Sequence, residues 1–347
     1  MKRNRLINTG FMIALLVILV IGYGLGFFIT KRYRSLDEFD NIMSEDTAQI
    51  ARNTIRGNIF ATKYVLPVSY AYFPYIDNHP DFIRYPFIIF LYSVLFFLGP
   101  DSPATIKLFN GFLFLLNGIL IYIIALNLLE RSQIELSKGK KNWIAAFTSV
   151  LSSFLVERYF QYTISDAYEI PTITISLFLI ITLIVLKSPA WAGFAQAILY
   201  MSRPNMVVFL PFIWIYLIWE KKSIKDRLLI TALFFGSFFI TLSPILVRNM
   251  MITGKLLFSL QQSIELLKDV TASHRELYMN FSIPSSIFPL TRPFISALFA
   301  KFKIEFVKPF TYLLKAEYLI GLFGILPFMI KFKKENKFKT KHNTKRF

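Results

Sequence analysis

Cysteine is absent from this chain, and histidine is scarce, with three among 347 residues. The missing thiols exclude disulfide bonds, thiolate catalysis and cysteine-based metal sites. Charge is also sparse: Asp, Glu, Lys and Arg together make up 17% of the sequence, whereas hydrophobic residues make up 55%. A soluble domain with a hydrated shell needs more polar residues than this. The composition therefore indicates an integral membrane protein.

Acidic residues are outnumbered by basic ones, 21 against 39, which gives a formal net charge of +18. In a soluble protein this excess would suggest a nucleic-acid partner. Here the basic residues cluster between apolar blocks, at 131–141, 221–227 and 331–346. Short basic loops of this kind mark the cytoplasmic side of a membrane protein. We therefore attribute the charge to membrane topology and expect membrane lipids, but no nucleic acid, as partners.

Apolar runs long enough to cross a bilayer recur along the chain. We expect an all-α transmembrane bundle of about eight spans, at residues 9–30, 104–129, 143–161, 167–187, 189–202, 205–220, 227–247 and 314–331. The first run is longer than the apolar part of a signal peptide, so it is expected to be a retained helix. The two runs on either side of Arg203-Pro204 are short, and they form either two helices that meet at an external turn or one broken helix.

The apolar segment 87–98 decides the topology. It lies between Pro86 and Gly99-Pro100, and it covers only about 18 Å as a helix, against about 30 Å of hydrocarbon. We expect it to lie in the membrane interface as a juxtamembrane helix. All three basic clusters then share the side of the N-terminus. The predicted protein lies in the cytoplasmic (inner) membrane, with both termini cytoplasmic and with residues 31–103 and 248–313 on the extracytoplasmic face.

Two adjacent acids begin a helix-like stretch in the first external segment. Ser44 has the residue type of an N-cap, which would place Glu45 and Asp46 in the first turn of a surface helix. Acids at this position can simply favour the positive end of the helix dipole. Alternatively, a carboxylate held at the membrane surface can act as a general base toward an acceptor hydroxyl. The spacing alone leaves both interpretations open.

Further polar residues cluster near the ends of the expected spans. His79 and Asp81 lie in a stretch rich in groups that bind a metal, a sugar or a phosphate, although their spacing fits no standard metal signature. Asp166 and Glu169 stand at the mouth of apolar helices, where acids are functional candidates or solvated helix caps. Arginines at the outer ends of other spans either reach the lipid headgroups or hold a phosphate. These arginines are Arg203 and Arg248.

Taken in order, these segments resemble the GT-C superfamily of membrane glycosyltransferases, in particular family 39-like bacterial proteins related to protein O-mannosyltransferases and aminoarabinose transferases. The resemblance covers about residues 10 to 260, and no single segment of it is a strong motif. The matching segments are Glu45 through Gly57, His79-Pro80-Asp81 to Pro86, Leu98 to Ala104, Ala192-Gly193, Arg203-Pro204-Asn205, and Ser243-Pro244 through Arg248-Asn249 to Gly254.

The resemblance implies a catalytic transmembrane module over residues 1–260, an external segment over 261–313, and a last span with a basic tail over 314–347. It implies inverting transfer of a sugar from a polyprenyl-phosphate carrier to a glycan, lipid or protein acceptor. Asp46 would be the general base, with Glu45 as the alternative, and Glu169 the second acid, with Asp166 as the alternative. The arginines that would hold the donor phosphate are Arg84, Arg203 and Arg248. A divalent metal ion, with His79, Asp81 and Asp166 as candidate ligands, is optional.

The relatives carry an Asp-Glu pair followed by Tyr, whereas this chain has Glu45-Asp46 followed by Thr47. One alternative function is therefore a catalytically inactive relative that serves as a binding or assembly subunit. Another is a transporter or flippase of lipid-linked sugars, which would need polar groups near the bilayer midplane and usually repeated halves. The expected spans are nearly uncharged, and the sequence has no internal repeat, so the enzyme is favoured over the transporter.

Overall fold

The computed structural model describes residues 9–31, 36–40, 42–132, 136–154, 166, 169–219 and 223–256, together with residues 260, 279, 295, 296, 299 and 300. The chain divides into two compact units, Met1–Gln262 and Ser263–Phe347. Nearly all described residues belong to the first unit, and the following description concerns that unit. The span expected at 314–331 and the basic tail lie outside the described residues.

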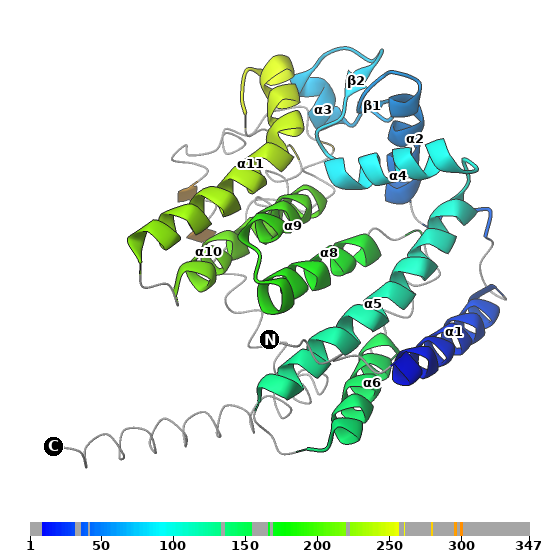
Figure 1. Cartoon of the computed structure of the whole chain (residues 1–347). Helices are drawn as coiled ribbons and strands as arrows, with labels where there is room; N and C mark the ends of the chain where they lie inside the picture. Colours follow the sequence, from blue (N-terminus) through cyan, green and yellow to red (C-terminus); the bar gives the residue numbers. More distant parts are fainter. Residues whose placement is uncertain are drawn as a thin grey trace. The chain divides into compact units, whose positions relative to one another are not determined.

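Helices dominate the first unit (Figure 1), as the sequence predicts for an all-α protein. Two very short strands, β1 (Ala61–Thr62) and β2 (His79–Pro80), pair antiparallel. The helices are α1 (Thr9–Lys31), α2 (Ile42–Ile55), α3 (Pro67–Tyr72), α4 (Pro86–Leu98), α5 (Pro103–Arg131), α6 (Lys138–Phe154), α8 (Glu169–Ile181), the π-helical turn η1 (Thr182–Leu186), α9 (Pro189–Ser202), the 3-10 helix η2 (Pro204–Phe209), α10 (Leu210–Trp219) and α11 (Ile224–Thr253).

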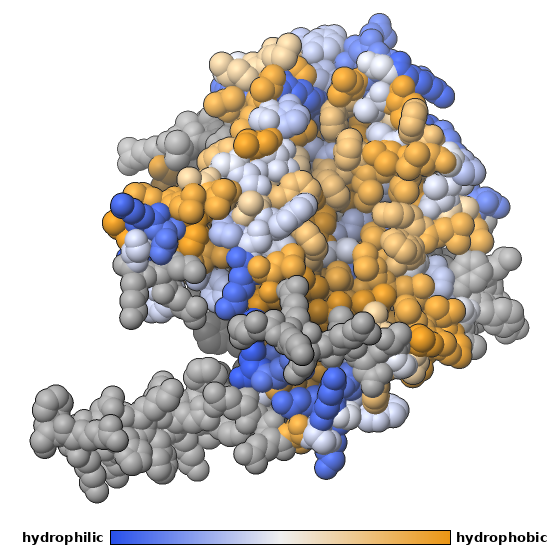
Figure 2. All heavy atoms as spheres, viewed as in Figure 1, coloured by the Kyte–Doolittle hydropathy of each residue, from blue (hydrophilic) through white to orange (hydrophobic). Residues whose placement is uncertain are grey.

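Three of the described helices are long and apolar enough to cross a membrane: Pro103–Arg131, Glu169–Leu186 and Ile224–Thr253. Protein covers little of them, since only 39%, 33% and 17% of their most apolar stretches are buried. Apolar surface on this scale is stable only when lipid covers it. Figure 2 shows orange, hydrophobic atoms gathered across the middle of the molecule. The long apolar helices thus indicate a membrane protein.

Two of the apolar runs predicted as spans form helices that are too short to cross a bilayer. The runs 189–202 and 205–220 form two helices, α9 with 14 residues and α10 with 10, and the 3-10 helix η2 separates them. Neither reaches across about 30 Å of hydrocarbon. The bounds of α1, Thr9–Lys31, agree within one residue with the run predicted over 9–30. The count of about eight spans therefore stays a prediction. In the described part of the chain, three helices are long and apolar enough to cross a membrane.

A layer of short elements lies at one end of the long helices (Figure 1). It contains α2, β1, α3, β2 and α4, and α2 packs on α4 through Ala48, Ala51, Ile88 and Tyr92. We call this layer the cap. Pro86 begins α4 because proline fits the first helical turn, and the amide of Gly99 closes it on the carbonyl of Leu95. The bounds of α4 agree with the short helix predicted over 87–98.

One local prediction in the cap is wrong. α2 begins at Ile42, so Ser44 lies inside the helix and is not its N-cap. The hydroxyl of Ser44 donates instead to the backbone carbonyl of Asp166, 3.1 Å away. A tertiary hydrogen bond has taken the place of the local capping bond that the sequence pattern suggests.

The long helices form closely packed pairs. α1 and α6 pack on α5 through a cluster that includes Leu15, Leu19 and Phe114. α9 packs on α11, and Gly193 allows the two backbones to touch, because a Cβ atom there would collide with the backbone carbonyl of Phe234. Small residues at helix contacts of this kind are typical of membrane bundles.

Basic residues gather at the end of the long helices away from the cap. Arg131 ends α5, and its guanidinium donates to the carbonyl of Ile184 in η1. Lys187 follows η1, while Lys225 and Arg227 lie in the first turn of α11. The opposite end of α11 meets the cap, where Arg248 donates to the carbonyl of Asp81. The helix ends thus differ in chemistry: lysines and arginines at one, paired acids and arginines at the other.

Candidate functional site

The Asp46 carboxylate is buried in the cap and paired with Arg84. Asp46 lies on α2, and Arg84 lies two residues before α4; the Oδ2 atom of Asp46 accepts a hydrogen bond from Nη2 of Arg84. The Asp46 side chain is 8% exposed and that of Arg84 is 10% exposed. Among the described residues, neither Oδ1 of Asp46 nor Nε of Arg84 has a hydrogen-bond partner. The pair therefore uses one of the two contacts that a guanidinium and a carboxylate can make.

Glu45, the neighbouring acid, points to solvent, because its residue is exposed whereas Asp46 is buried. Successive residues on a helix are rotated by about 100°, and in α2 this rotation turns position 46 to the interior and position 45 to solvent. Of the two candidate bases, Asp46 alone is held against an arginine in the cap.

A second arginine reaches the same place from α11. The Asp81 carboxylate accepts from the backbone amide of Arg84 at 2.8 Å, and the Asp81 carbonyl accepts from Nη2 of Arg248 at 2.8 Å. Burial raises the pKa of the Asp81 carboxyl, and the charge of Arg84 opposes part of this shift. The structure thus brings four predicted residues together, from α2, from the turn before α4 and from α11. They are Asp46, Asp81, Arg84 and Arg248.

Aromatic rings hold the Arg248 guanidinium in position. Its central carbon lies 4.4 Å from the ring centre of Phe82 and 5.1 Å from that of Phe60. Cation–π contacts at this distance stabilise a guanidinium that has left bulk water. Arg248 Nε has no hydrogen-bond partner within the described ranges. The rings therefore orient a cation whose hydrogen-bonding capacity is only partly used.

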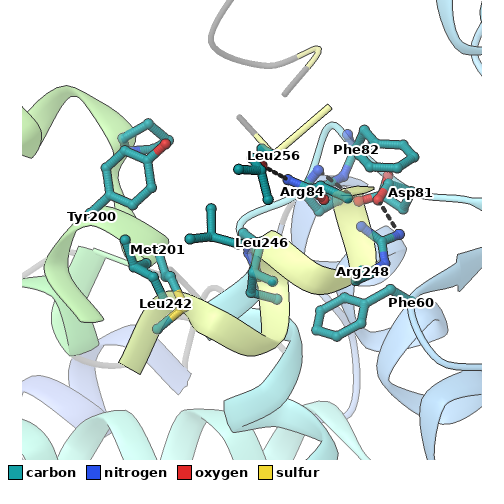
Figure 3. A pocket seen from close by; sticks show the side chains of 14 residues that line it. Phe60, Asp81, Phe82, Arg84, Tyr200, Met201, Leu242, Leu246, Arg248 and Leu256 are labelled. Atoms are coloured by element: carbon teal, nitrogen blue, oxygen red, sulfur yellow. Dashed lines mark hydrogen bonds between the residues drawn. The ribbon is translucent and has the colours of Figure 1, made fainter. Parts of the chain in front are cut away.

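Three of these four residues, all but Asp46, line a pocket with two kinds of wall (Figure 3), about 590 Å³ in empty volume including its open mouth. The polar wall carries Asp81, Arg84 and Arg248. The apolar wall comes from the end of α9 and the last turns of α11, and it includes Tyr200, Met201, Leu242, Ile245 and Leu246. Arg84 also lines a second, smaller pocket, together with Met43, Thr47, Ile83, Tyr85 and Ile88. Arg84 thus lies at the boundary of both spaces.

Glu169 and Arg203 form a separate pair. Nη2 of Arg203 lies 3.5 Å from Oε1 of Glu169, with the two side chains 39% and 24% exposed. A half-exposed pair at this distance contributes little to stability. Arg203 ends α9 in extended conformation, directly before Pro204, which lines the larger pocket. The second predicted acid is therefore tied to the chain segment that leads into the pocket wall.

Asp166 belongs to a buried network on the other side of α2. Its Oδ2 accepts from the amide of Asp40 at 2.8 Å, and its carbonyl accepts from the hydroxyl of Tyr92 at 2.7 Å. Lys107 of α5, itself 2% exposed, lies 3.3 Å from Oδ1 of Asp40 and donates to the carbonyl of Glu38 at 2.7 Å. Burial raises the pKa of Asp166 to about 6, and Lys107 opposes the shift. Asp166 thus joins chain segments that are distant in sequence.

The contacts of His79 are those of a buried structural residue. It is fully buried in β2, its Nδ1 lies 2.9 Å from the carbonyl of Tyr75, and its ring packs edge-on against Phe73. The metal ligands proposed from the sequence do not meet: His79 lies in the strand pair, Asp81 beside Arg84, and Asp166 beside Asp40. Within the described ranges, no three His, Asp or Glu side chains come close enough to hold a metal ion.

Sequence reasoning missed four residues of this region. Lys107 and Asp40 were not candidates, although a lysine in an apolar helix is a recognised signal of function or of a buried partner. Phe60 and Phe82 carried no signal, because an aromatic residue in a hydrophobic chain is common.

A comparison of the chain with protein-family models, with curated proteins and with solved structures finds no match.

Proposed function

We propose that this protein is a membrane glycosyltransferase that moves a sugar from a polyprenyl-phosphate carrier to an acceptor hydroxyl, with Asp46 as the general base. The observation that carries the proposal is the position of a buried carboxylate beside a pocket with an arginine wall and an apolar wall. The GT-C resemblance of the sequence leads to the same activity. The acceptor, a glycan, a lipid or a protein, is left open.

The two walls fit an amphiphilic anion better than a soluble one. Guanidinium groups are well shaped to hold phosphate oxygens, and Arg84 and Arg248 both have unused N–H groups inside the described region. Leu242 and Leu246 continue from this polar wall along α11, a helix long and apolar enough to cross a membrane. A lipid carrier could therefore place its phosphate against the arginines while its first isoprene units lie on α11.

The transfer balances as a single displacement. The acceptor oxygen attacks C1 of the sugar, and the bond between C1 and the phosphate oxygen breaks, so that its electron pair leaves with the phosphate. Asp46 takes the acceptor proton and later releases it to water. Arg84 and Arg248 stabilise the charge that develops on the leaving phosphate.

We further propose that the cap faces the extracytoplasmic side. The basic ends of α5 and α11 lie away from the cap, and basic helix ends favour the cytoplasm. A carrier flipped across the cytoplasmic membrane would then present its phosphate at the level of the cap.

The test is sugar transfer in membranes that contain the unmodified protein or a variant, with radiolabelled polyprenyl-phosphate sugars as donors. Asp46→Asn should lower the rate by at least about 10²-fold, since general-base catalysis contributes that much. Glu45→Gln, which removes the exposed neighbouring charge, is the matched control and should stay near the unmodified rate. Full activity of Asp46→Asn at normal protein abundance would refute the assignment of the base. Donor binding without consumption by the unmodified protein would favour a binding or assembly subunit.

A further inference from the structure

We propose that Arg84 is a positioning residue that exchanges partners, holding Asp46 when the site is empty and moving to the donor phosphate when the carrier binds. The exchange would release the base only once the donor is in place. This inference rests on the proposed function, because it requires a phosphate-bearing ligand in the larger pocket.

The geometry makes the exchange local. The backbone of Arg84 is fixed by the hydrogen bond from its amide to Asp81, while its guanidinium makes one contact with Asp46. Arg84 also lines both the larger pocket and the smaller one beside Thr47. A change of side-chain rotamer can therefore move the charge from one space toward the other. No movement of α2 or α4 is required.

The burial and the incomplete hydrogen bonding of the pair favour a competition between the Asp46 carboxylate and the donor phosphate for Arg84. Asp46 and Arg84 are both about nine-tenths buried, so neither tolerates the loss of its partner without a replacement. The contact is nevertheless incomplete, since Oδ1 of Asp46 and Nε of Arg84 lack partners among the described residues. A phosphate offers more acceptor oxygens than the single carboxylate oxygen now in use. The donor thus competes with Asp46 for a cation that the carboxylate holds by one hydrogen bond.

The competition has a measurable consequence. If Asp46 holds Arg84 away from the phosphate, part of the donor's binding energy is used to break the pair. Removing the carboxylate should therefore tighten donor binding, although it abolishes catalysis. A base that only touches the acceptor would not have this effect on the donor.

The experiment measures the affinity of the purified full-length protein in lipid nanodiscs for undecaprenyl phosphate. We expect Asp46→Asn to bind at least about fivefold more tightly than the unmodified protein, the lower end of typical coupling between two sites. Arg84→Gln should bind about tenfold or more weakly, because it removes a charged donor from the phosphate. Asp77→Asn, the matched loss of an exposed charge, should stay within about twofold.

The double variant Asp46→Asn with Arg84→Gln separates the exchange from simple repulsion between Asp46 and the phosphate. Repulsion predicts that Asp46→Asn tightens binding even without Arg84, whereas the exchange predicts a change within about twofold of Arg84→Gln alone. Undecaprenol, which lacks the phosphate, should bind all variants equally. Inorganic phosphate tests whether the headgroup alone suffices, and it should show the same order of affinities at higher concentration.

The possible failures are distinct. If the unmodified protein binds no undecaprenyl phosphate, the proposed function falls, and the exchange falls with it. If it binds the lipid but Asp46→Asn does not bind more tightly, or Arg84→Gln does not bind more weakly, the exchange alone is overturned. Thermal unfolding of each variant in the same nanodiscs identifies a variant that has not folded. For a misfolded Asp46→Asn, the smaller neutral variant Asp46→Ser replaces it with the same expectation.

Discussion

Lys107 is the residue whose loss should most destabilise the cap, and Lys107→Met tests this. The lysine is 2% exposed, and its Nζ atom lies 2.7 Å from the carbonyl of Glu38 and 3.3 Å from Oδ1 of Asp40. Asp40 in turn donates its amide to Asp166. Methionine has a similar volume but no charge, so the substitution removes the cation that offsets the repulsion between the Asp40 and Asp166 carboxylates. Breaking a buried ion pair in this way costs about 3–5 kcal/mol.

The assay is the unfolding free energy of the purified protein in mild detergent, measured by tryptophan fluorescence. Lys63→Met is the matched control, because Lys63 is exposed in the cap, and it should change stability by less than about 0.5 kcal/mol. The pH dependence provides a second check. The folded-state pKa of Asp166 is about 6, above the ordinary value, so the folded state binds more protons than the unfolded state between about pH 4 and 6. The contribution of Asp166 to stability therefore increases as the pH falls through this window.

In Lys107→Met the pKa of Asp166 should rise further, since Lys107 lowers it. The loss of stability should therefore be largest above pH 7 and should shrink toward pH 5, where Asp166 is protonated. A loss no larger than that of Lys63→Met would refute the view that Lys107 supports the cap. A loss that grows as the pH falls would refute the electrostatic explanation.

Two further predictions concern packing and orientation. Gly193→Ala should destabilise the protein by about 1–3 kcal/mol, because the new methyl group meets the backbone of Phe234. Gly236→Ala, whose methyl group enters open space beside α11, should be neutral or slightly stabilising. Equal effects of the two substitutions in thermal unfolding would contradict this packing. The chain has no native cysteine, so a single introduced cysteine can be labelled selectively. The two variants are Lys63→Cys in the cap and Lys225→Cys at the start of α11, each tested in cells whose outer envelope is removed and whose cytoplasmic membrane is intact. A membrane-impermeant maleimide should label position 63 directly and position 225 only after permeabilisation; the reverse pattern would place the cap in the cytosol.

The sequence predicted those parts of the fold that depend on local signals. Helix α4 lies where Pro86 and Gly99 bracket an apolar run, because proline begins helices and the chain after Gly99 cannot continue one. Hydropathy also located α5 and α11. It could not show where the runs between them break, since the helix lengths of α9 and α10 depend on the turn at Arg203-Pro204 and on the 3-10 helix η2 that follows.

The sequence predicted which residues belong to the candidate site, but not which of them contact one another. Arg248 was singled out by its type and its position at a span end, Asp46 as one of two acids at the start of a surface helix, and Arg84 from what the GT-C resemblance implies. The pairing of Asp46 with Arg84, 38 residues later, and of Arg248 with the carbonyl of Asp81, 167 residues earlier, depends on how the cap packs against α11. The prediction that Ser44 is an N-cap was wrong for the same reason, because the hydrogen bond of Ser44 to the Asp166 carbonyl spans 122 residues. Local rules describe the free ends of a helix and not its tertiary neighbours.

The order of the two acids in α2 can be explained by helix geometry, and this leads to a last prediction. Adjacent helical residues differ by about 100° in direction and about 1.5 Å in height, so the residue that faces Arg84 is decided by the register of α2 and not by which acid comes first. With α2 beginning at Ile42, position 46 faces inward and position 45 faces solvent. Asp46→Glu should therefore lower transfer by up to about 10²-fold, because its longer side chain displaces the carboxylate by about 1 Å or more. Glu45→Asp should leave transfer unchanged, and so should not rescue the activity when the two substitutions are combined into an Asp-Glu pair. Recovery of activity in that double variant would mean that the order of the acids, and with it a different register of α2, determines the proposed transfer.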